Sequence, residues 1–227
     1  MKSEAYNSLF GSNVGQLHFN ANIHDKSISR ILAYLVFNSA EDFTNISEQD
    51  IQTEIDKLMR YKFNNTAFSG ITEPNAFAQK RLDYKIQCGP TGEDLVFYEF
   101  KTVFKVTENS ITERMVFPDL IKLAIKKHEN PDCKAFFLLA GKQKVYKNAL
   151  SSKNLRLPDK YSDPYSKEKV ILLLDDLKSI LNTNTFTDHL TQLTSKGIRG
   201  ISISPSVWKH LEGISVLSFK LNNPVKY

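Results

Sequence analysis

The apolar segment formed by residues 95–104 limits most strongly what this chain can fold into. Its β-branched and aromatic residues are typical of a strand, yet it also carries Glu99 and Lys101. Because alternate side chains of a strand share one face, these two charged groups point the same way, while Phe100 points to the opposite face. Burying an acid and an amine is costly unless they are paired, bind a metal or take part in catalysis. The segment therefore predicts a strand that carries functional residues.

A second acidic residue precedes this strand. Residues 81–86 predict another strand, which carries Asp83, and a Gly-Pro-Thr-Gly turn of hairpin length at residues 89–92 joins the two. Two carboxylates that converge from neighbouring strands offer the hard oxygen ligands that Mg²⁺ and Mn²⁺ prefer. A metal held there could bind a scissile phosphate, lower the pKa of a water and stabilise developing charge. Lys101 could orient or deprotonate that water, or offset negative charge.

The N-terminal part of the chain predicts two helices. Residues 1–23 show no strong periodicity, and Asp25 can cap a helix with a clear apolar stripe on one face. Ser47 with Asp50 resembles a capping box at the start of a second helix. Residues 64–80 contain two asparagines, a glycine and a proline, and predict an irregular connection.

The rest of the chain predicts a mixture of helices and strands. A third strand is expected at residues 111–117, followed by a helix over 119–128 with Pro118 at its first position and Asn130-Pro131 after it, and by a buried strand at 134–139. Residues 142–168 predict a surface loop, and residues 170–181 either a strand followed by a helix or one helix. A helix through Leu190 ends at Gly197, a short helix that contains Trp208 starts at Ser204-Pro205, and a last strand covers residues 214–221.

The arrangement of Asp83, Glu99 and Lys101 resembles the PD-(D/E)xK nuclease superfamily. In that superfamily an Asp on one strand is followed by an Asp/Glu-x-Lys motif on the next strand, and then by a helix and another strand. The matching stretch runs from about residue 48 to residue 141, and Leu82 stands where the proline of the motif's name would be.

The resemblance implies a restriction-endonuclease-like core and a role for each motif residue. Asp83, Glu99 and the backbone carbonyl of Phe100 would hold Mg²⁺ or Mn²⁺, and Lys101 would be the catalytic lysine. The superfamily often sends a further acid into the site from its first helix. Glu54 is the candidate because it lies within an apolar stripe.

Acidic residues of the second predicted helix allow other interpretations. Glu54 could equally be a partly exposed side chain, or form a salt bridge to Lys57 or Lys80. Glu48 and Asp50 are most simply first-turn acids favoured by the helix dipole.

His24 permits a second resemblance. Cap-snatching endonucleases of segmented negative-strand RNA viruses are similar to this superfamily and add a histidine from an N-terminal helix as a metal ligand. His24 precedes the first predicted helix, which could pack beside the site. A histidine at the start of a helix is more often solvated or structural.

Basic residues offer candidate contacts to nucleic acid. Lys122 and Lys126 lie one turn apart on the same face of the predicted helix, and Lys80-Arg81 lies just before Asp83. Such groups can contact phosphates, although a solvated amphipathic face explains them more simply. The net charge of +5 favours a polyanionic partner in the same weak sense.

Composition narrows the class further. The apolar runs are too short to span a bilayer, the N-terminus has no apolar signal core, and the two cysteines are too few for a disulfide framework. We therefore expect no membrane partner and a reducing, intracellular (cytoplasmic) location.

These observations predict an α/β protein with a central mixed β-sheet flanked by helices. Residues 1–227 would form a single nuclease-like domain, with its core at about 24–141 and a C-terminal α/β extension at about 142–227. The expected function is metal-dependent hydrolysis of nucleic acid, with DNA favoured. The alternatives are an RNA endonuclease that uses His24 and a non-catalytic module that binds nucleic acid or protein. A homodimer is compatible with each alternative.

Overall fold

The computed structural model describes residues 18–38, 46–63, 69–77, 80–103, 113–142, 169–180 and 184–226. The helices in this part of the chain are α2 (Ala21–Asn38), α3 (Glu48–Phe63), α4 (Glu113–Glu129), α6 (Leu174–Ile180) and α7 (Asn184–Ser195). The strands there are β1 (Ser69–Phe77), β2 (Lys80–Cys88), β3 (Asp94–Val103), β4 (Lys134–Lys142), β5 (Val170–Leu173), β6 (Ile198–Leu211), β7 (Ile214–Leu221) and β8 (Val225–Lys226).

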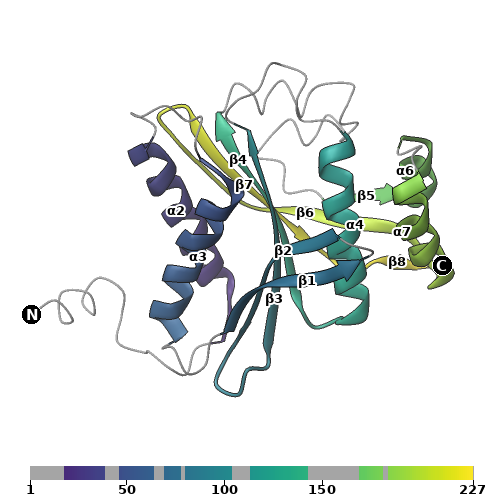
Figure 1. The fold of residues 1–227 in the computed structure, drawn as a ribbon, viewed down its shortest axis with the longest axis horizontal. Coiled ribbons are helices and arrows are strands. Elements are labelled where there is room, and N and C mark those ends of the chain that lie inside the picture. Colours follow the sequence, from purple (N-terminus) through teal and green to yellow (C-terminus); the bar gives the residue numbers. More distant parts are fainter. Residues whose placement is uncertain are drawn as a thin grey trace, which may run out of the picture.

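All these strands form one mixed sheet. Its order is β1-β2-β3-β4-β7-β6-β5, and β8 pairs with β6. Neighbouring strands are antiparallel except β3 and β4, which are parallel and are joined through α4. A parallel pair needs such a crossover because its strands begin at the same end of the sheet. Helices α2 and α3 cover one face, and α4, α6 and α7 lie on the other (Figure 1).

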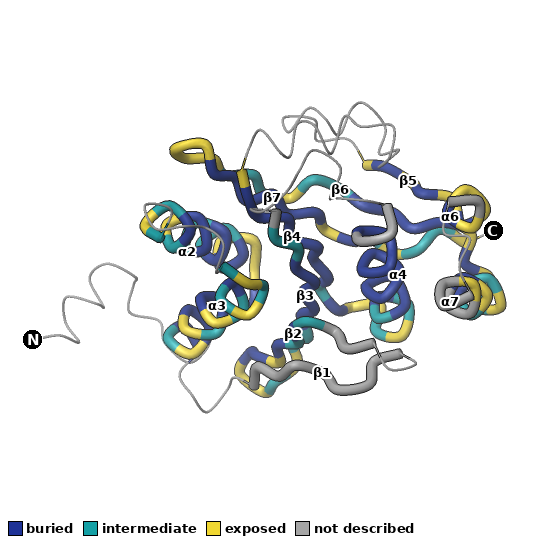
Figure 2. The backbone as a smooth tube through the Cα atoms, turned by 45° about the horizontal axis from the view of Figure 1, so that its top comes forward, coloured by how far each residue is buried: buried dark blue, intermediate teal, exposed yellow. Residues whose placement is uncertain are grey.

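The sheet separates two apolar cores. The core on the α4 side contains side chains of α4, α6 and α7 together with Phe97, Phe137 and Phe219 of the sheet. The core on the α2 and α3 side contains Tyr98 and Phe136. The central strands β3, β4 and β7 are therefore buried along most of their length, as are the sheet-facing turns of α4 (Figure 2). The predicted α/β class with a mixed sheet flanked by helices is confirmed.

The predicted start of the first helix is wrong, whereas that of the second is confirmed. Helix α2 begins at Ala21, because the Asn20 side-chain oxygen, rather than Asp25, accepts a hydrogen bond from the Ile23 N–H at 3.1 Å. At α3, Asp50 accepts a hydrogen bond from the Ser47 N–H at 2.7 Å, and the Ser47 hydroxyl accepts one from the Asp50 N–H at 3.4 Å.

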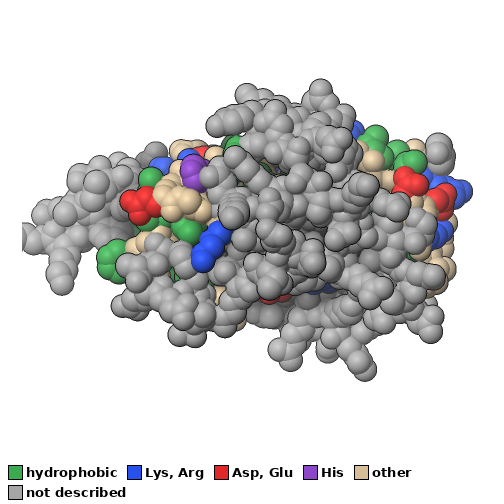
Figure 3. All heavy atoms as spheres, turned by 90° about the horizontal axis from the view of Figure 1, so that it is seen from above, with side chains coloured by type: hydrophobic (Ala, Val, Ile, Leu, Met, Phe, Trp, Pro, Cys, Tyr) green, Lys and Arg blue, Asp and Glu red, His purple; other side chains and the backbone are tan. Residues whose placement is uncertain are grey.

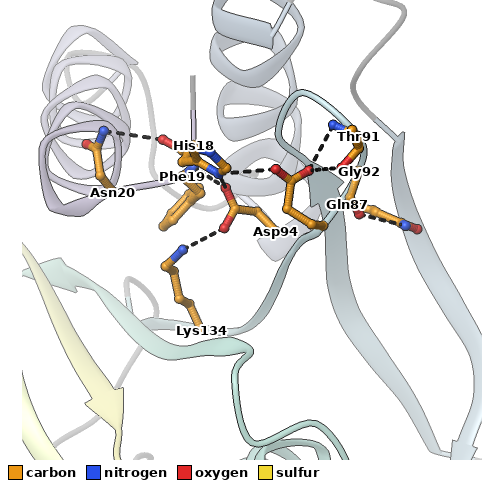
Figure 4. Close-up of polar contacts among 9 residues, drawn as sticks. His18, Phe19, Asn20, Gln87, Thr91, Gly92, Asp94 and Lys134 are labelled. Carbon is orange, nitrogen blue, oxygen red and sulfur yellow. Dashed lines mark hydrogen bonds and ion pairs between the residues drawn. The ribbon is translucent and has the colours of Figure 1, made fainter. Parts of the chain in front are cut away.

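Asp94 ties the segment before α2 to the turn between β2 and β3. Its carboxylate accepts hydrogen bonds from the Phe19 N–H at 2.6 Å and from Lys134 at 2.9 Å, and lies 3.2 Å from the His18 ring (Figure 4). These partners come from two segments, residues 18–19 and β4, and together they fix where the chain enters α2.

The irregular connection predicted at residues 64–80 is wrong for residues 69–77, which form β1, and for Lys80, which begins β2; residues 64–68 and 78–79 lie outside the described part. Strand β1 lies at the edge of the sheet and pairs with β2 through two register shifts. An edge strand with bulges tolerates Pro74, because a proline there removes no bond from a central ladder.

The strand predicted at 111–117 is wrong for residues 113–117, which already belong to α4, while residues 111–112 lie outside the described part. Pro118 therefore stands inside the helix rather than at its first position. The predicted helix end before Asn130 and the predicted strand after it are confirmed by α4 and β4.

Residues 170–181 contain a strand followed by a helix, one of the two alternatives predicted for them, although residue 181 is not described. Helix α7 and the last long strand, β7, are also confirmed. The short helix predicted at Ser204-Pro205 is wrong, because these residues and Trp208 lie in β6. A register shift between Pro205 and Val207 accommodates the proline. The predicted loop at 142–168 lies outside the described residues except for Lys142, which ends β4.

The C-terminal residues complete the same sheet that carries Glu99. Strand β7 pairs directly with β4, and β6 pairs with β7. None of the helices in the described ranges has both the length and the apolar character needed to cross a membrane.

Candidate functional site

The alternation of β3 sends its charged residues to the α4 side of the sheet. Val96, Tyr98 and Phe100 pack into the core beneath α2 and α3, so Glu99 and Lys101 must point the other way. On β2, Tyr84 packs into that same core, which places Asp83 on the α4 side as well. The structure therefore brings the three predicted motif residues to one face.

Asp83 lies where β2 and β3 separate. Their paired residues end at Tyr84 and Tyr98, and beyond this pair the N–H of Phe100, two residues after Tyr98, donates to the Asp83 carboxylate at 2.7 Å. The carboxylate thus replaces the main-chain acceptor that a continued ladder would supply. A strand residue directs its N–H and C=O toward the same neighbour, so the Phe100 carbonyl also faces this opening.

Glu99 is fully buried, and among the residues that the structure describes it pairs with Lys122. Its Oε2 atom accepts a hydrogen bond from Lys122 at 2.7 Å, whereas Oε1 has no hydrogen-bond partner among the described residues. Burial raises the pKa of Glu99 well above its usual value, the nearby carboxylates of Asp119 and Asp83 raise it further, and Lys122 opposes them. A cation beside this side chain would lower the cost of keeping it ionised.

Helix α4 adds an acid and a lysine that the motif does not contain. Lys122 lies 2.8 Å from Asp119 Oδ1, and Lys101 lies 2.9 Å from Asp119 Oδ2. Burial lowers the pKa of each lysine, but the neighbouring carboxylates outweigh it and the net shift is upward. Asp119 therefore links the lysine of the motif to the lysine that holds Glu99.

Glu48 approaches the same cluster from the first turn of α3. Its Oε1 atom lies 3.4 Å from the Lys101 amine. Burial raises the pKa of Glu48, Lys101 opposes this shift, and the charge of Asp83 adds to it. The acid that the second helix brings to this cluster is thus Glu48.

Glu54 lies elsewhere, although it is buried as its apolar stripe predicts. It pairs with Arg30 of α2 at 2.8 Å and with Lys57 one turn along its own helix. The stripe faces α2 at this position, so Glu54 does not join Asp83 and Glu99.

His24 also lies apart from the carboxylates. It belongs to the first turn of α2 rather than preceding that helix, and its ring is buried against the sheet, where it stacks on Phe136 with centroids 3.8 Å apart. Its two nitrogens contact Tyr98 Oη and Ser218 Oγ at 2.9 and 2.8 Å. The sheet stands between this histidine and Glu99.

The basic residues proposed to contact phosphates take different positions. Lys122 is buried in the cluster rather than on a solvated helix face, and Lys126 lies 3.6 Å from Glu129. The side chains of Lys80 and Arg81 lie outside the described residues. On the face seen from above, the described Lys and Arg side chains stand singly or beside acidic ones (Figure 3).

The sequence contains one signal for the contribution of α4 that simple periodicity does not use. Asp119 and Lys122 are charged residues in an otherwise apolar part of α4. All the remaining residues from 120 to 125 are apolar and buried. A charged pair three residues apart in such a segment must be neutralised inside the protein. Glu48 carries no comparable signal, because a first-turn acid is common in exposed helices.

The donor set suits a hard divalent cation, although Glu99 and Asp119 are paired with lysines. The described residues contain no cluster of three or more His, Cys, Asp or Glu side chains with the geometry of a metal site. Two features nevertheless fit Mg²⁺ or Mn²⁺. The buried Glu99 Oε1 has no hydrogen-bond partner among the described residues, and the Asp83 carboxylate, near enough to raise the pKa of Glu99, is a further oxygen donor.

Comparisons of the chain with protein-family models, with curated proteins and with solved structures found no match, so no family is assigned from them.

Proposed function

We propose that this chain is a metal-dependent nuclease that hydrolyses phosphodiester bonds, with DNA as the favoured substrate. The observation that carries the proposal is the Asp83 carboxylate held by the Phe100 N–H at the separation of two strands, on the face that also presents Glu99 and Lys101. A fixed acid beside a buried acid and a lysine is the set of groups that phosphodiester hydrolysis with a divalent cation requires.

The order of elements supports a restriction-endonuclease-like core. Helix α3 is followed by the antiparallel strands β1, β2 and β3, then by α4 and by β4 parallel to β3. This order agrees with the PD-(D/E)xK pattern of an acid on one strand, an acid-x-Lys motif on the next, and a helix and strand after it.

Each residue of the cluster has a role in this proposal. Asp83, Glu99 and the Phe100 carbonyl would hold Mg²⁺ or Mn²⁺, with Glu48 rather than Glu54 as the additional acid. The bound cation would supply Lewis-acid activation of a water and neutralisation of phosphate charge. Lys101, held between Asp119 and Glu48, would orient the attacking water and offset the charge that develops on the phosphate.

Nuclease assays on the purified protein test the proposal. We expect linear duplex DNA to be cut in Mg²⁺ or Mn²⁺, and Lys101→Ala and Asp83→Asn each to lower the rate by about 100-fold or more. Lys209→Ala is the control, because it removes a lysine of β6 that pairs with Asp25 of α2 at 2.9 Å. Unchanged cleavage in both site variants, with folding intact, would contradict the site.

A binding module without catalytic activity is the second candidate. The observation that favours it is the chain of ion pairs through Lys122, Asp119 and Lys101, which balances charge without a metal. This candidate predicts binding of DNA or RNA with neither cleavage nor a shift of the melting temperature by Mn²⁺. The RNA endonuclease that uses His24 gains no support from the position of that residue, and RNA enters the assay as a second substrate. Size-exclusion chromatography reports whether the active species is a homodimer.

A further inference from the structure

Lys122 is a buried cation that lies against a proposed metal ligand. Its amine is 2.7 Å from Glu99 Oε2 and 2.8 Å from Asp119 Oδ1, and its side chain is almost wholly buried. One ammonium group therefore bridges an acid of the sheet and an acid of its own helix. The other oxygen of Glu99 has no hydrogen-bond partner among the described residues.

A second buried lysine on α4 shows what a structural lysine does on this helix. Lys127 donates hydrogen bonds to the main-chain carbonyls of Pro131 and Cys133, and so closes the connection from α4 to β4. Both lysines are similarly buried. They differ in their partners, because Lys127 holds neutral carbonyl groups whereas Lys122 holds two carboxylates of the candidate site.

We propose that Lys122 is the internal counter-ion of this site, which neutralises Glu99 in the metal-free protein and releases it when a divalent cation binds. This inference rests on the proposed metal site. Asp119 keeps the ammonium group in place after the exchange, because Lys122 already contacts its Oδ1 atom. Lys122 is thus a positioning residue that acts through Glu99.

The exchange of Lys122 for a metal at Glu99 lowers the affinity of the site for the metal. A divalent cation that binds Glu99 must displace Lys122 from a short, buried ion pair. The two charges of such a pair attract each other more strongly than they would at a surface. A variant without the Lys122 ammonium group has no internal cation to compete with the metal for Glu99. The carboxylates of Glu99 and Asp119 then lie near each other without a positive charge between them. The metal-free protein should then be less stable, and the metal should bind more tightly.

The test compares Lys122→Met with Lys127→Met in mildly alkaline buffer, which favours ionised carboxyl groups. Melting temperature is measured without metal and along a Mn²⁺ titration, and calorimetry gives the Mn²⁺ affinity directly. We expect Lys122→Met to melt lower than wild type without metal and to gain more from Mn²⁺, with affinity about tenfold tighter or more. Lys127→Met should also melt lower, but with the wild-type response to Mn²⁺.

The remaining outcomes separate the two proposals. Wild-type protein that neither binds Mn²⁺ nor cuts nucleic acid refutes the nuclease and the exchange together. If wild-type protein binds Mn²⁺ and cuts nucleic acid, but Lys122→Met has unchanged or weaker Mn²⁺ affinity, the exchange alone is refuted. If Lys122→Met does not fold, Lys122→Gln takes its place, since an amide can still donate to a carboxylate. Failure of both variants to fold even in Mn²⁺ makes Lys122 purely structural and overturns the inference.

Discussion

At the scale of single residues, His24 is a polar side chain that is buried in the core with its hydrogen-bonding groups satisfied. Both ring nitrogens contact hydroxyl groups, those of Tyr98 and Ser218, and the ring face lies on Phe136. Burial lowers the pKa of His24 from 6.5 to about 3, and the charge of Asp25 only partly opposes it. The folded protein therefore keeps this residue neutral.

This neutrality predicts an acid-sensitive stability. Between pH 6.5 and about 3 the unfolded chain binds a proton at His24 that the folded chain does not, so stability falls as pH falls. The free energy of unfolding should drop about 1.4 kcal/mol per pH unit more steeply in wild type than in His24→Gln. Urea denaturation across this range measures both slopes. The exposed His210, changed to Gln, is the control, and parallel curves for wild type and His24→Gln would contradict the assignment.

Glu48 and Glu54 form a natural pair for testing the site. Both are acids of α3, yet Glu48 lies near Lys101 and Glu54 pairs with Arg30 on the opposite side of the sheet from Glu99. We expect Glu48→Gln to reduce both cleavage and the Mn²⁺-induced rise in melting temperature by removing a charge beside the metal. Glu54→Gln should lower stability and leave the response to Mn²⁺ unchanged. The reverse result would restore Glu54 as the third acid.

The candidate site was predictable only as far as local rules reach. Strand alternation placed Glu99 and Lys101 on one face, and the short turn placed Asp83 beside them. Helix periodicity also indicated that Glu54 is buried, but periodicity gives the direction of a side chain and not the neighbour it meets. Asp119 joins the cluster through α4, whose docking on the sheet depends on contacts distant in sequence.

At the scale of elements, the ends of helices are fixed by a few hydrogen bonds. Ser47 and Asp50 exchange bonds at the start of α3, the turn that also carries Glu48. Capping groups of this kind satisfy N–H groups that have no partner within the helix.

Removing the cap should have a measurable cost. Ser47→Ala should destabilise the protein by about 1 kcal/mol, because one capping acceptor is lost. Ser29→Ala is the control, since the Ser29 hydroxyl bonds to the carbonyl of Asp25 inside α2, where alanine is a better helix former. Thermal melts of both variants measure the difference. Equal decreases of melting temperature in the two variants would show that the cap adds no stability beyond that of an ordinary helix serine.

Two strands and the start of one helix were predicted wrongly for one shared reason. Strand β1 contains Pro74, β6 contains Pro205, and α4 contains Pro118, and each proline was taken as a boundary. The structure accommodates them at a sheet edge, at a register shift and near the start of a helix. Tertiary pairing thus overrides a local breaker wherever the missing N–H is not needed by a neighbour.

At the scale of the whole molecule, the sheet joins residues that are far apart in the chain. Strand β4 lies between β3 and β7, and its buried side chains Phe137 and Leu139 pack in the core that also contains Leu217 and Phe219 of β7. The predicted core and the predicted C-terminal extension therefore share a sheet.

This arrangement predicts that a chain shortened after Lys142 does not fold. Without β7 one edge of β4 has no partner, and the apolar side chains beneath it lose their cover. Such a fragment should lack a cooperative thermal transition by circular dichroism and should bind a dye for exposed apolar surface. The full chain is the control, and a cooperative melt of the fragment would show that the core is independent.

The same pairing of β4 with β7 has a consequence during synthesis. Residues 143–213 must leave the ribosome after β4 before its partner strand exists, so the nascent chain holds an open, apolar strand edge for that whole interval. Chaperone supply and translation speed, rather than the intrinsic stability of the finished protein, should then govern how much of it is recovered when it is overproduced.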